Sequence, residues 1–113
     1  MKVHELKPNQ KKISIVVKIE EIAEQREVVS KIDNKFHQVA DALVGDETGC
    51  VYLSIWDDNL QYAKEGKYYK ITNGYTSVYR SSLRLDLGKY EKLTETEARF
   101  EINTANNMSL KEL

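Results

Sequence analysis

The amino-terminal part of the chain contains the stretch KKISIVVKIEEI, whose hydrophobic pattern changes phase partway along. Apolar side chains recur at every second position from Ile13 to Ile19, and the pattern resumes at Ile22 with the opposite parity. Because one extra residue turns every later side chain of a strand to the other face, this change predicts a bulge or sharp bend near Glu20 and Glu21. We therefore expect one long, bent strand that serves two sheets.

Four further strands are indicated by apolar or alternating stretches between turn residues. They are expected at 36–45, 50–56, 67–79 and 83–88. In the 67–79 strand, Asn73 and Gly74 favour another bulge or bend. The stretch DDNLQYAKEG, before that strand, predicts a short helix with Asp57 or Asp58 as N-cap and Gly66 as the stop.

Five strands in this order predict an all-β fold, a five-stranded Greek-key barrel of the OB type with a short helix between strands 3 and 4. An SH3-like barrel is the main alternative, but it more usually has only one turn of 3₁₀-helix before its last strand. At 113 residues the chain has the length of one domain. We expect residues 1–93 to form the barrel and residues 94–113 to form a C-terminal extension, either a short helix or a partly ordered tail.

The formal net charge of −1 hides an uneven distribution of charge. Residues 67–90 carry five basic side chains against one acidic side chain, so a weakly acidic protein contains one basic stretch the size of a hairpin. A single cysteine, Cys50, excludes an intramolecular disulfide and a cysteine-rich zinc site. No apolar run approaches the roughly 20 residues of a membrane span, and the amino end lacks the apolar segment of a secretory signal. We therefore expect a cytoplasmic protein without membrane contact.

The only tryptophan, Trp56, stands on the 50–56 strand with a parity opposite to the aliphatic residues of that strand. In OB barrels the face of strands 2 and 3 binds nucleic acids, and aromatic rings there stack on bases for about 1–3 kcal/mol each. Tyr75 and Tyr79 lie four residues apart on the neighbouring basic hairpin, hence on one strand face. These three rings are candidates to stack on bases. Tyr52 is on the same face as Trp56, and the sequence leaves open whether it binds or packs. The structural alternative is half-buried packing, which is common for aromatic residues in strands.

Basic residues near these rings are candidates to contact phosphates. On the hairpin they are Arg80, Arg84 and Lys89. Lys31 and Lys35, in the first hairpin loop, would close over a bound strand from the other side. The alternative is that these charges form an ordinary solvated surface.

Signals for catalysis are weak throughout the chain. His4 and His37 lack partners at metal-ligand or triad spacing. Turn and N-cap roles explain the acidic pairs at 46–47 and 57–58 without a metal. The glycine patterns of nucleotide-binding loops do not occur. We expect a protein that is not an enzyme and has neither a cofactor nor a metal site.

Three stretches combine into a fairly specific pattern: LKPNQKKISIVVKI, VGDETGCVYLSIW and KEGKYYKITNGYTSVYRSSLRLDLG. Over about residues 6–93 the chain resembles the single-OB-fold single-stranded DNA-binding proteins of archaea, which are related to the human-type proteins of repair complexes and to the OB domains of replication protein A. The resemblance implies that Trp56, Tyr75 and Tyr79 stack on bases, with tyrosine at two positions where members often have tryptophan or phenylalanine. Many members continue into a disordered tail that recruits other proteins. This chain reaches Leu113 without one, so recruitment through a tail is not expected.

The residues and the resemblance together predict a non-enzymatic, sequence-tolerant binder that protects single-stranded DNA during replication, recombination and repair. A protein with this function is expected to be nucleoid-associated within the cytoplasm. Repair or replication proteins are its expected partners, and a monomer or a weak self-association is its expected state. One alternative is an OB-fold protein-interaction subunit of a larger complex, in which the rings would form an apolar patch without cations nearby. Another is binding of single-stranded RNA, since base stacking neither requires nor excludes a 2′-hydroxyl group.

Overall fold

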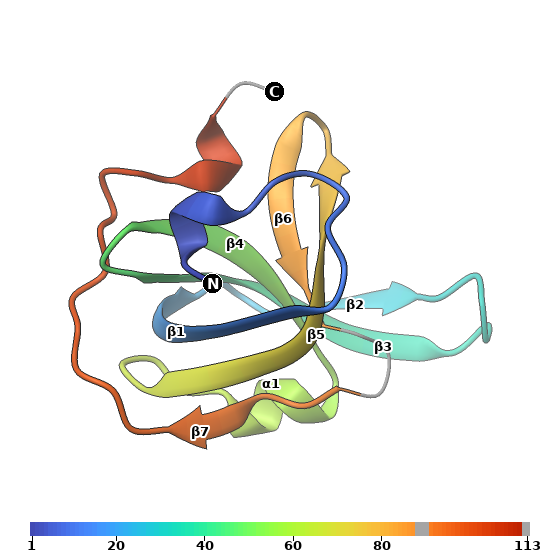
Figure 1. Cartoon of the computed structure of the whole chain (residues 1–113). Helices are drawn as coiled ribbons and strands as arrows, with labels where there is room; N and C mark the ends of the chain where they lie inside the picture. Colours follow the sequence, from blue (N-terminus) through green and yellow to red (C-terminus); the bar gives the residue numbers. More distant parts are fainter. Residues whose placement is uncertain (88–90, 112–113) are drawn as a thin grey trace.

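The computed structural model describes residues 1–87 and 91–111. Five strands close a barrel in the order β1, β3, β4, β6, β5 and back to β1 (Figure 1). They are β1 (Ile13–Ile22), β3 (Phe36–Asp46), β4 (Gly49–Trp56), β5 (Tyr68–Tyr79) and β6 (Ser82–Asp86). Neighbours are antiparallel except for β4 and β6, which run parallel. A short helix, α1 (Asp58–Tyr62), separates β4 from β5 in the chain, so the predicted barrel with one helix between its third and fourth strands is confirmed.

The strand β1 contains the predicted bulge. Its pairing with β3 changes register between Ile19 and Glu21, and the part from Ile13 to Lys18 pairs with β5. One strand therefore belongs to both halves of the barrel, as expected. The strand β5 is irregular at the predicted place, where Asn73 has a φ of 54°.

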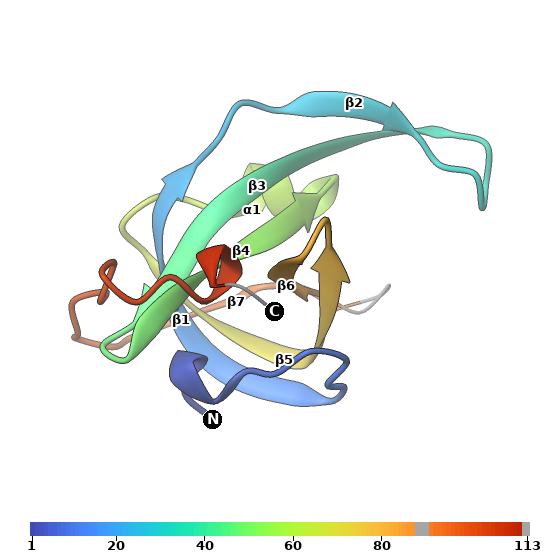
Figure 2. The same cartoon turned by 90° about the horizontal axis from the view of Figure 1, so that it is seen from above.

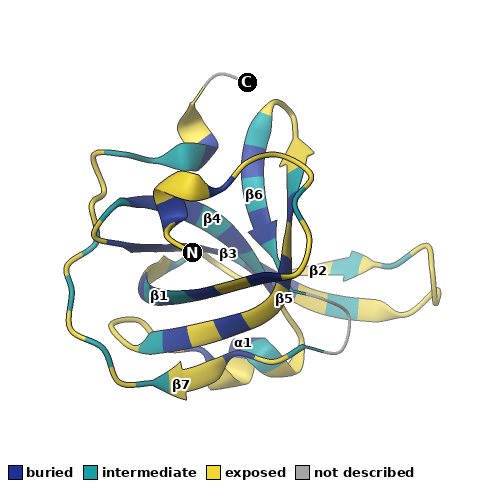
Figure 3. Ribbon diagram, in the orientation of Figure 1, coloured by how far each residue is buried: buried dark blue, intermediate teal, exposed yellow. Residues whose placement is uncertain are grey.

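Buried residues alternate with less buried ones along much of the barrel strands (Figure 3). Apolar side chains of the buried parity fill the barrel interior. On β4 and β6 the fully buried residues of this parity are Val51, Leu53, Ile55, Leu83 and Leu85. Tyr69 is also fully buried, and its hydroxyl accepts a hydrogen bond from the Lys64 amide at 2.9 Å and donates one to the Tyr62 carbonyl at 3.3 Å. The ring therefore fills the core while its polar tip stays hydrogen-bonded.

Helix α1 follows Asp57, as predicted, but ends at Tyr62, before the expected stop at Gly66. Ala63, directly after the helix, has extended backbone angles and is buried together with Leu60 in the core. Gly66 instead adopts a φ of 83° in the turn that leads into β5. Within the part of the chain that the structure describes, no helix is both long and apolar enough to cross a membrane.

The hairpin of β2 (Arg26–Val29) and the first part of β3 forms an arm that projects from the barrel (Figure 2). At the opposite end of the sheet order, β7 (Thr94–Thr96) pairs with β5. The 3₁₀-helix η1 (Val3–Glu5) lies against the barrel, where Val3 is buried and its amide donates to the Asp46 carboxylate at 3.0 Å. These peripheral elements leave the outer surface of β4, β5 and β6 accessible in part.

The C-terminal extension packs along the barrel from β7 to η2 (Met108–Leu110) (Figure 1). The ring of Phe100 meets that of Tyr68 edge to face at 4.9 Å. At η2, the Ser109 hydroxyl accepts from the Tyr52 amide at 2.9 Å and donates to the Leu83 carbonyl. The segment expected to be a short helix or a partly ordered tail therefore contains a strand and one turn of 3₁₀-helix, because hydrogen bonds to the barrel hold its backbone.

Candidate nucleic-acid interface

Side chains that point away from the interior on β4, β5 and β6 form one outer face. Its exposed rings are Trp56, Tyr75 and Tyr79, with 43%, 41% and 56% of their surface accessible. Tyr52, which is half-buried, belongs to the same face of β4. These four residues define what we call the aromatic face. On β4, Trp56 faces outward and the aliphatic residues face inward, as the sequence predicts.

The strand register shows how the rings are spaced. Ser54 of β4, Asp86 of β6 and Tyr75 of β5 form one row across three strands. Neighbouring strands lie about 4.8 Å apart, so the Cα atoms at the two ends of this row are roughly 10 Å apart. Trp56 stands one outward position beyond Ser54, and Tyr79 stands two outward positions beyond Tyr75 in the other direction. The rings therefore follow a diagonal line across the face, along which bases of one strand can stack.

Arg84 lies in the middle of the aromatic face and is held there by its neighbours. Its guanidinium donates two hydrogen bonds to the carboxylate of Asp41 on β3, at 2.8 Å and 3.4 Å. Its Cζ lies 5.6 Å from the ring centroid of Tyr52 and 5.9 Å from that of Tyr79, within the range of cation–π contacts. A phosphate contact by Arg84 stays a prediction, and such a contact would compete with Asp41. Sequence reasoning missed Asp41, whose outward parity on β3 was the available signal.

Arg80 forms the two-residue turn of the β5–β6 hairpin together with Ser81. Both residues have positive φ, 51° and 65°, as a two-residue hairpin turn matched to the strand twist requires. The Cζ of Arg80 lies 5.2 Å from the ring centroid of Tyr79. The exposed guanidinium therefore borders one end of the aromatic face.

The other predicted phosphate contacts lie elsewhere. Lys31 and Lys35 are exposed in the loop of the arm (Figure 2). The arm adjoins the aromatic face because Val39 of β3 pairs with Trp56 of β4. Lys89 lies outside the described residues. The structure thus brings two arginines to the aromatic face and places two lysines on the adjoining arm.

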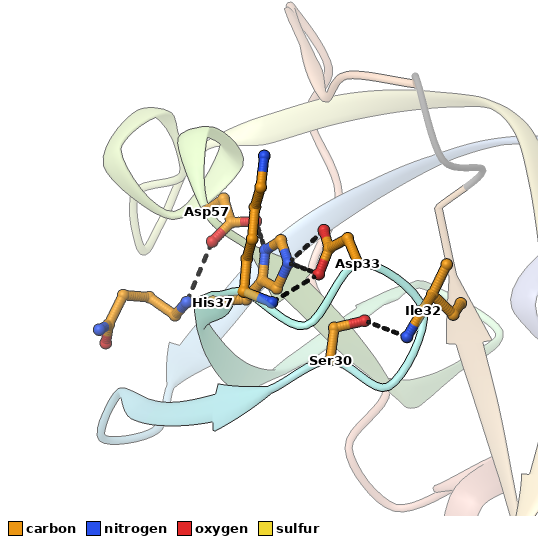
Figure 4. Close-up of polar contacts among 7 residues, drawn as sticks. Ser30, Ile32, Asp33, His37 and Asp57 are labelled. Atoms are coloured by element: carbon orange, nitrogen blue, oxygen red, sulfur yellow. Dashed lines mark hydrogen bonds and ion pairs between the residues drawn. The ribbon is translucent and has the colours of Figure 1, made fainter.

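His37, for which sequence reasoning found no partner, lies in the arm next to its loop and pairs with Val28 of β2 (Figure 4). Its Nδ1 is 2.6 Å from Asp57 Oδ2, and its Nε2 is 2.9 Å from Asp33 Oδ2. Its ring meets that of Trp56 edge to face, with centroids 6.3 Å apart. His37 therefore fastens the loop of the arm to the end of β4 beside Trp56. Among the described residues, no group of His, Cys, Asp or Glu side chains is arranged to hold a metal ion.

The two carboxylates favour the protonated, positively charged form of His37 in the folded protein. Hydrogen bonding to Asp57 first, and to Asp33 next, raises the pKa of His37 above its ordinary value of 6.5. A raised pKa in the folded state stabilises the fold below pH 6.5, and this contribution is lost as the pH rises through the raised value. We expect the melting temperature of the wild type to exceed that of His37→Gln most at acidic pH. The difference should shrink as the pH rises above the raised pKa of His37. A difference that stays constant over the same pH series would contradict this expectation.

The aromatic face carries acidic groups as well as cations. Burial raises the pKa of Asp86 above its ordinary value of 3.8, although Ser77 donates a hydrogen bond to it at 2.9 Å. Asp41 and Asp86 lie on the same outer surface as Arg80 and Arg84. A surface of mixed charge favours stacking of bases over dense phosphate contact.

The barrel topology is that of an OB fold, and an exposed line of aromatic rings crosses its outer face. A family model described as single-stranded DNA-binding protein Ssb-like, OB fold, matches residues 6–95. The chain is also 35% identical over 94 residues to the single-stranded DNA-binding protein Ssb of Saccharolobus solfataricus, covering 83% of this chain and 62% of that protein. The chain therefore belongs to the Ssb-like OB-fold family, a family of binding proteins that are not enzymes.

Further relatives support the fold. An uncharacterized protein of Arabidopsis thaliana is 26% identical over 121 residues, which cover 99% of this chain and 79% of that protein. The solution structure of a hypothetical protein from Arabidopsis thaliana superposes with a TM-score of 0.81 at 26% identity, over 99% of this chain and 83% of that one. The second OB-fold domain of replication protein A from Methanococcus maripaludis superposes with a TM-score of 0.69 at 22% identity. The match covers 89% of this chain and 98% of that one. At that level of identity the last similarity supports the fold alone.

Proposed function

We propose that this protein binds and protects single-stranded DNA, tolerating most sequences, in replication, recombination and repair. The observation that carries the proposal is the diagonal line of three exposed rings, Trp56, Tyr75 and Tyr79, on the outer face of a barrel of the Ssb-like family. Every base has a flat face, so stacking on such rings needs no particular sequence. We expect the protein to act as a monomer or a weakly associating one, with repair or replication proteins as partners.

The same chemistry gives a preference for single strands over duplex. In a duplex the bases are already stacked and paired, so rings on a protein surface gain access to them only after the strands separate. A single strand offers its bases directly, while Arg80 and the lysines of the arm neutralise its phosphates. The rings thus supply most of the affinity and the cations supply attraction at a distance.

The direct test uses fluorescence anisotropy of a labelled oligo-dT. We expect unlabelled single-stranded DNA to displace the label, and duplex of equal length to displace it poorly. Competition with a matched RNA strand decides between DNA and RNA as the preferred ligand. Equal competition by duplex and single strand would contradict the proposal, because stacking on free bases would then not explain binding.

Arg80 provides a prediction about salt. Arg80→Ala should weaken binding to oligo-dT and reduce the slope of log K against log salt by about 1, because one phosphate contact is lost. The matched control is Lys70→Ala, an exposed cation on the part of β5 that pairs with β7, which should leave the slope unchanged. A slope that Arg80→Ala leaves intact would remove Arg80 from the interface.

The alternative of a protein-interaction subunit finds less support. It requires an apolar patch without cations nearby, whereas Arg80 and Arg84 lie 5.2 Å and 5.9 Å from the Tyr79 ring centroid. A ring bordered by two guanidinium groups is better suited to a negatively charged ligand with aromatic bases.

A further inference from the structure

A cavity of about 230 Å³ opens on the outside of the barrel next to the aromatic face. Its lining consists of Glu21, Ala23, Asp41, Leu43, Tyr52 and Arg84. An apolar cavity of about 150 Å³ already admits a benzene molecule, so the available volume suffices for a planar ring. The lining combines an aromatic ring, an aliphatic side chain, two carboxylates and a guanidinium, which is an unusual mixture for a purely structural gap.

The strand register explains why these residues meet. Glu21 of β1, Leu43 of β3, Tyr52 of β4 and Arg84 of β6 are successive partners in one row across four strands. The bulge in β1 produces this alignment, because the register shift between Ile19 and Glu21 sets Glu21 opposite Leu43 on the outer face. The irregularity in the first strand therefore places a carboxylate at the cavity.

The base of the cavity is fixed before any ligand arrives. Arg84 holds Asp41 through two hydrogen bonds and lies 5.6 Å from the Tyr52 ring centroid. Arg26 also lies near this carboxylate, with its Nη2 3.7 Å from Asp41 Oδ1. A carboxylate has about four acceptor positions, so Asp41 can still accept from a ligand beside both arginines. Glu21 is exposed, so its carboxylate oxygens are accessible to a ligand. Two carboxylates thus present acceptors beside a ring on which a base can stack.

Nucleobases differ in what they present to such acceptors. Cytosine carries an exocyclic amino group, which donates to carboxylates, whereas thymine has a carbonyl acceptor at the corresponding position. A thymine in the cavity would place that carbonyl against carboxylate oxygens with no proton between them, which disfavours it. A carboxylate is accordingly a common partner of the cytosine amino group.

We propose that this cavity is a base subsite that accepts a nucleobase with an exocyclic amino group, cytosine in preference to thymine. Tyr52 stacks on the base, Glu21 and Asp41 accept from its amino group, and Arg84 acts as a positioning residue that orients Asp41. This inference rests on the proposed binding of single-stranded DNA. Stacking on Trp56, Tyr75 and Tyr79 tolerates any sequence, and the subsite adds selectivity at one nucleotide.

The test compares the affinities of oligo-dC and oligo-dT of equal length at neutral pH. We expect the wild type to bind oligo-dC about tenfold more tightly, the ratio that one discriminating contact to a base supplies. Glu21→Ala should lower the ratio toward one, because it removes one of the two acceptors for the cytosine amino group. Glu20→Ala is the matched control, since it removes the same charge from a neighbouring exposed residue that does not line the cavity. It should preserve the wild-type ratio.

Each other outcome has a distinct meaning. Tight binding of both oligonucleotides by the wild type with a ratio of one would overturn the subsite and leave the proposed function standing. Equal loss of the ratio in Glu21→Ala and Glu20→Ala would also overturn it, because the preference would then come from charge at a distance. Failure of the folded wild type to bind either oligonucleotide would overturn the proposed function itself.

Discussion

Leu85→Ala is expected to lower the free energy of unfolding by about 2–5 kcal/mol, the largest stability effect among the substitutions considered. Leu85 of β6 is fully buried and pairs with Leu53 of β4 and with Thr76 of β5. In the sheet, β6 lies between β4 and β5 and pairs with both. Shortening the Leu85 side chain therefore leaves a cavity in the core at the place where these strands close the barrel. Urea unfolding followed by circular dichroism measures the change.

The chain offers a closely matched control for this prediction. Leu110→Ala makes the same chemical change at a residue of η2 that is 72% exposed, and it should alter the free energy of unfolding by less than about 0.5 kcal/mol. Equal effects of the two substitutions, or an unchanged urea midpoint for Leu85→Ala, would mean that β6 does not present Leu85 to the core.

Trp56→Ala is expected to weaken binding of single-stranded DNA by about 1–3 kcal/mol, roughly 5-fold to 150-fold in Kd. The ring is 43% exposed and lies on the outside of β4, so the variant should stay folded with a similar melting temperature. Its aromatic neighbour is His37, which meets it edge to face and leaves a flat side of the indole for a base. Isothermal titration with oligo-dT measures the loss.

Tyr62→Ala is the control for the loss of an exposed ring. Tyr62 is 47% exposed, yet it packs on Tyr69 at α1 rather than on the aromatic face. Its removal should leave the Kd for oligo-dT unchanged. Should Trp56→Ala retain wild-type affinity, or should it unfold, the role given to Trp56 would be wrong.

The barrel could be predicted from the sequence because local alternation determines it. The phase change after Ile19 located the bulge of β1, and the parity of the 50–56 strand placed Trp56 outside and Leu53 inside. Both features follow from the two-residue repeat of a strand, which is readable from neighbouring residues alone. The candidate stacking rings were found by the same means, and their binding roles stay predictions.

Features that depend on distant partners could not be predicted in this way. Asp41 and Arg84 are 43 residues apart in the chain, and they meet only because β3, β4 and β6 lie side by side. His37 gains one of its two carboxylates from Asp57, which follows β4 and is 20 residues away in the chain. The C-terminal extension has no hydrophobic pattern that would predict its structure. Hydrogen bonds between Ser109 and the barrel order it instead. In each case the partner, rather than the local sequence, sets the structure.

Titration of the intrinsic fluorescence of Trp56 with oligo-dT, with duplex of equal length as control, tests the central claim most directly. The chain has one tryptophan, so the signal reports on the aromatic face alone. We predict strong quenching by the single strand, little change with the duplex, and a weaker response as salt increases. A fluorescence spectrum that single-stranded DNA leaves unchanged, in a sample shown to be folded, would contradict stacking on Trp56 and with it the proposed function.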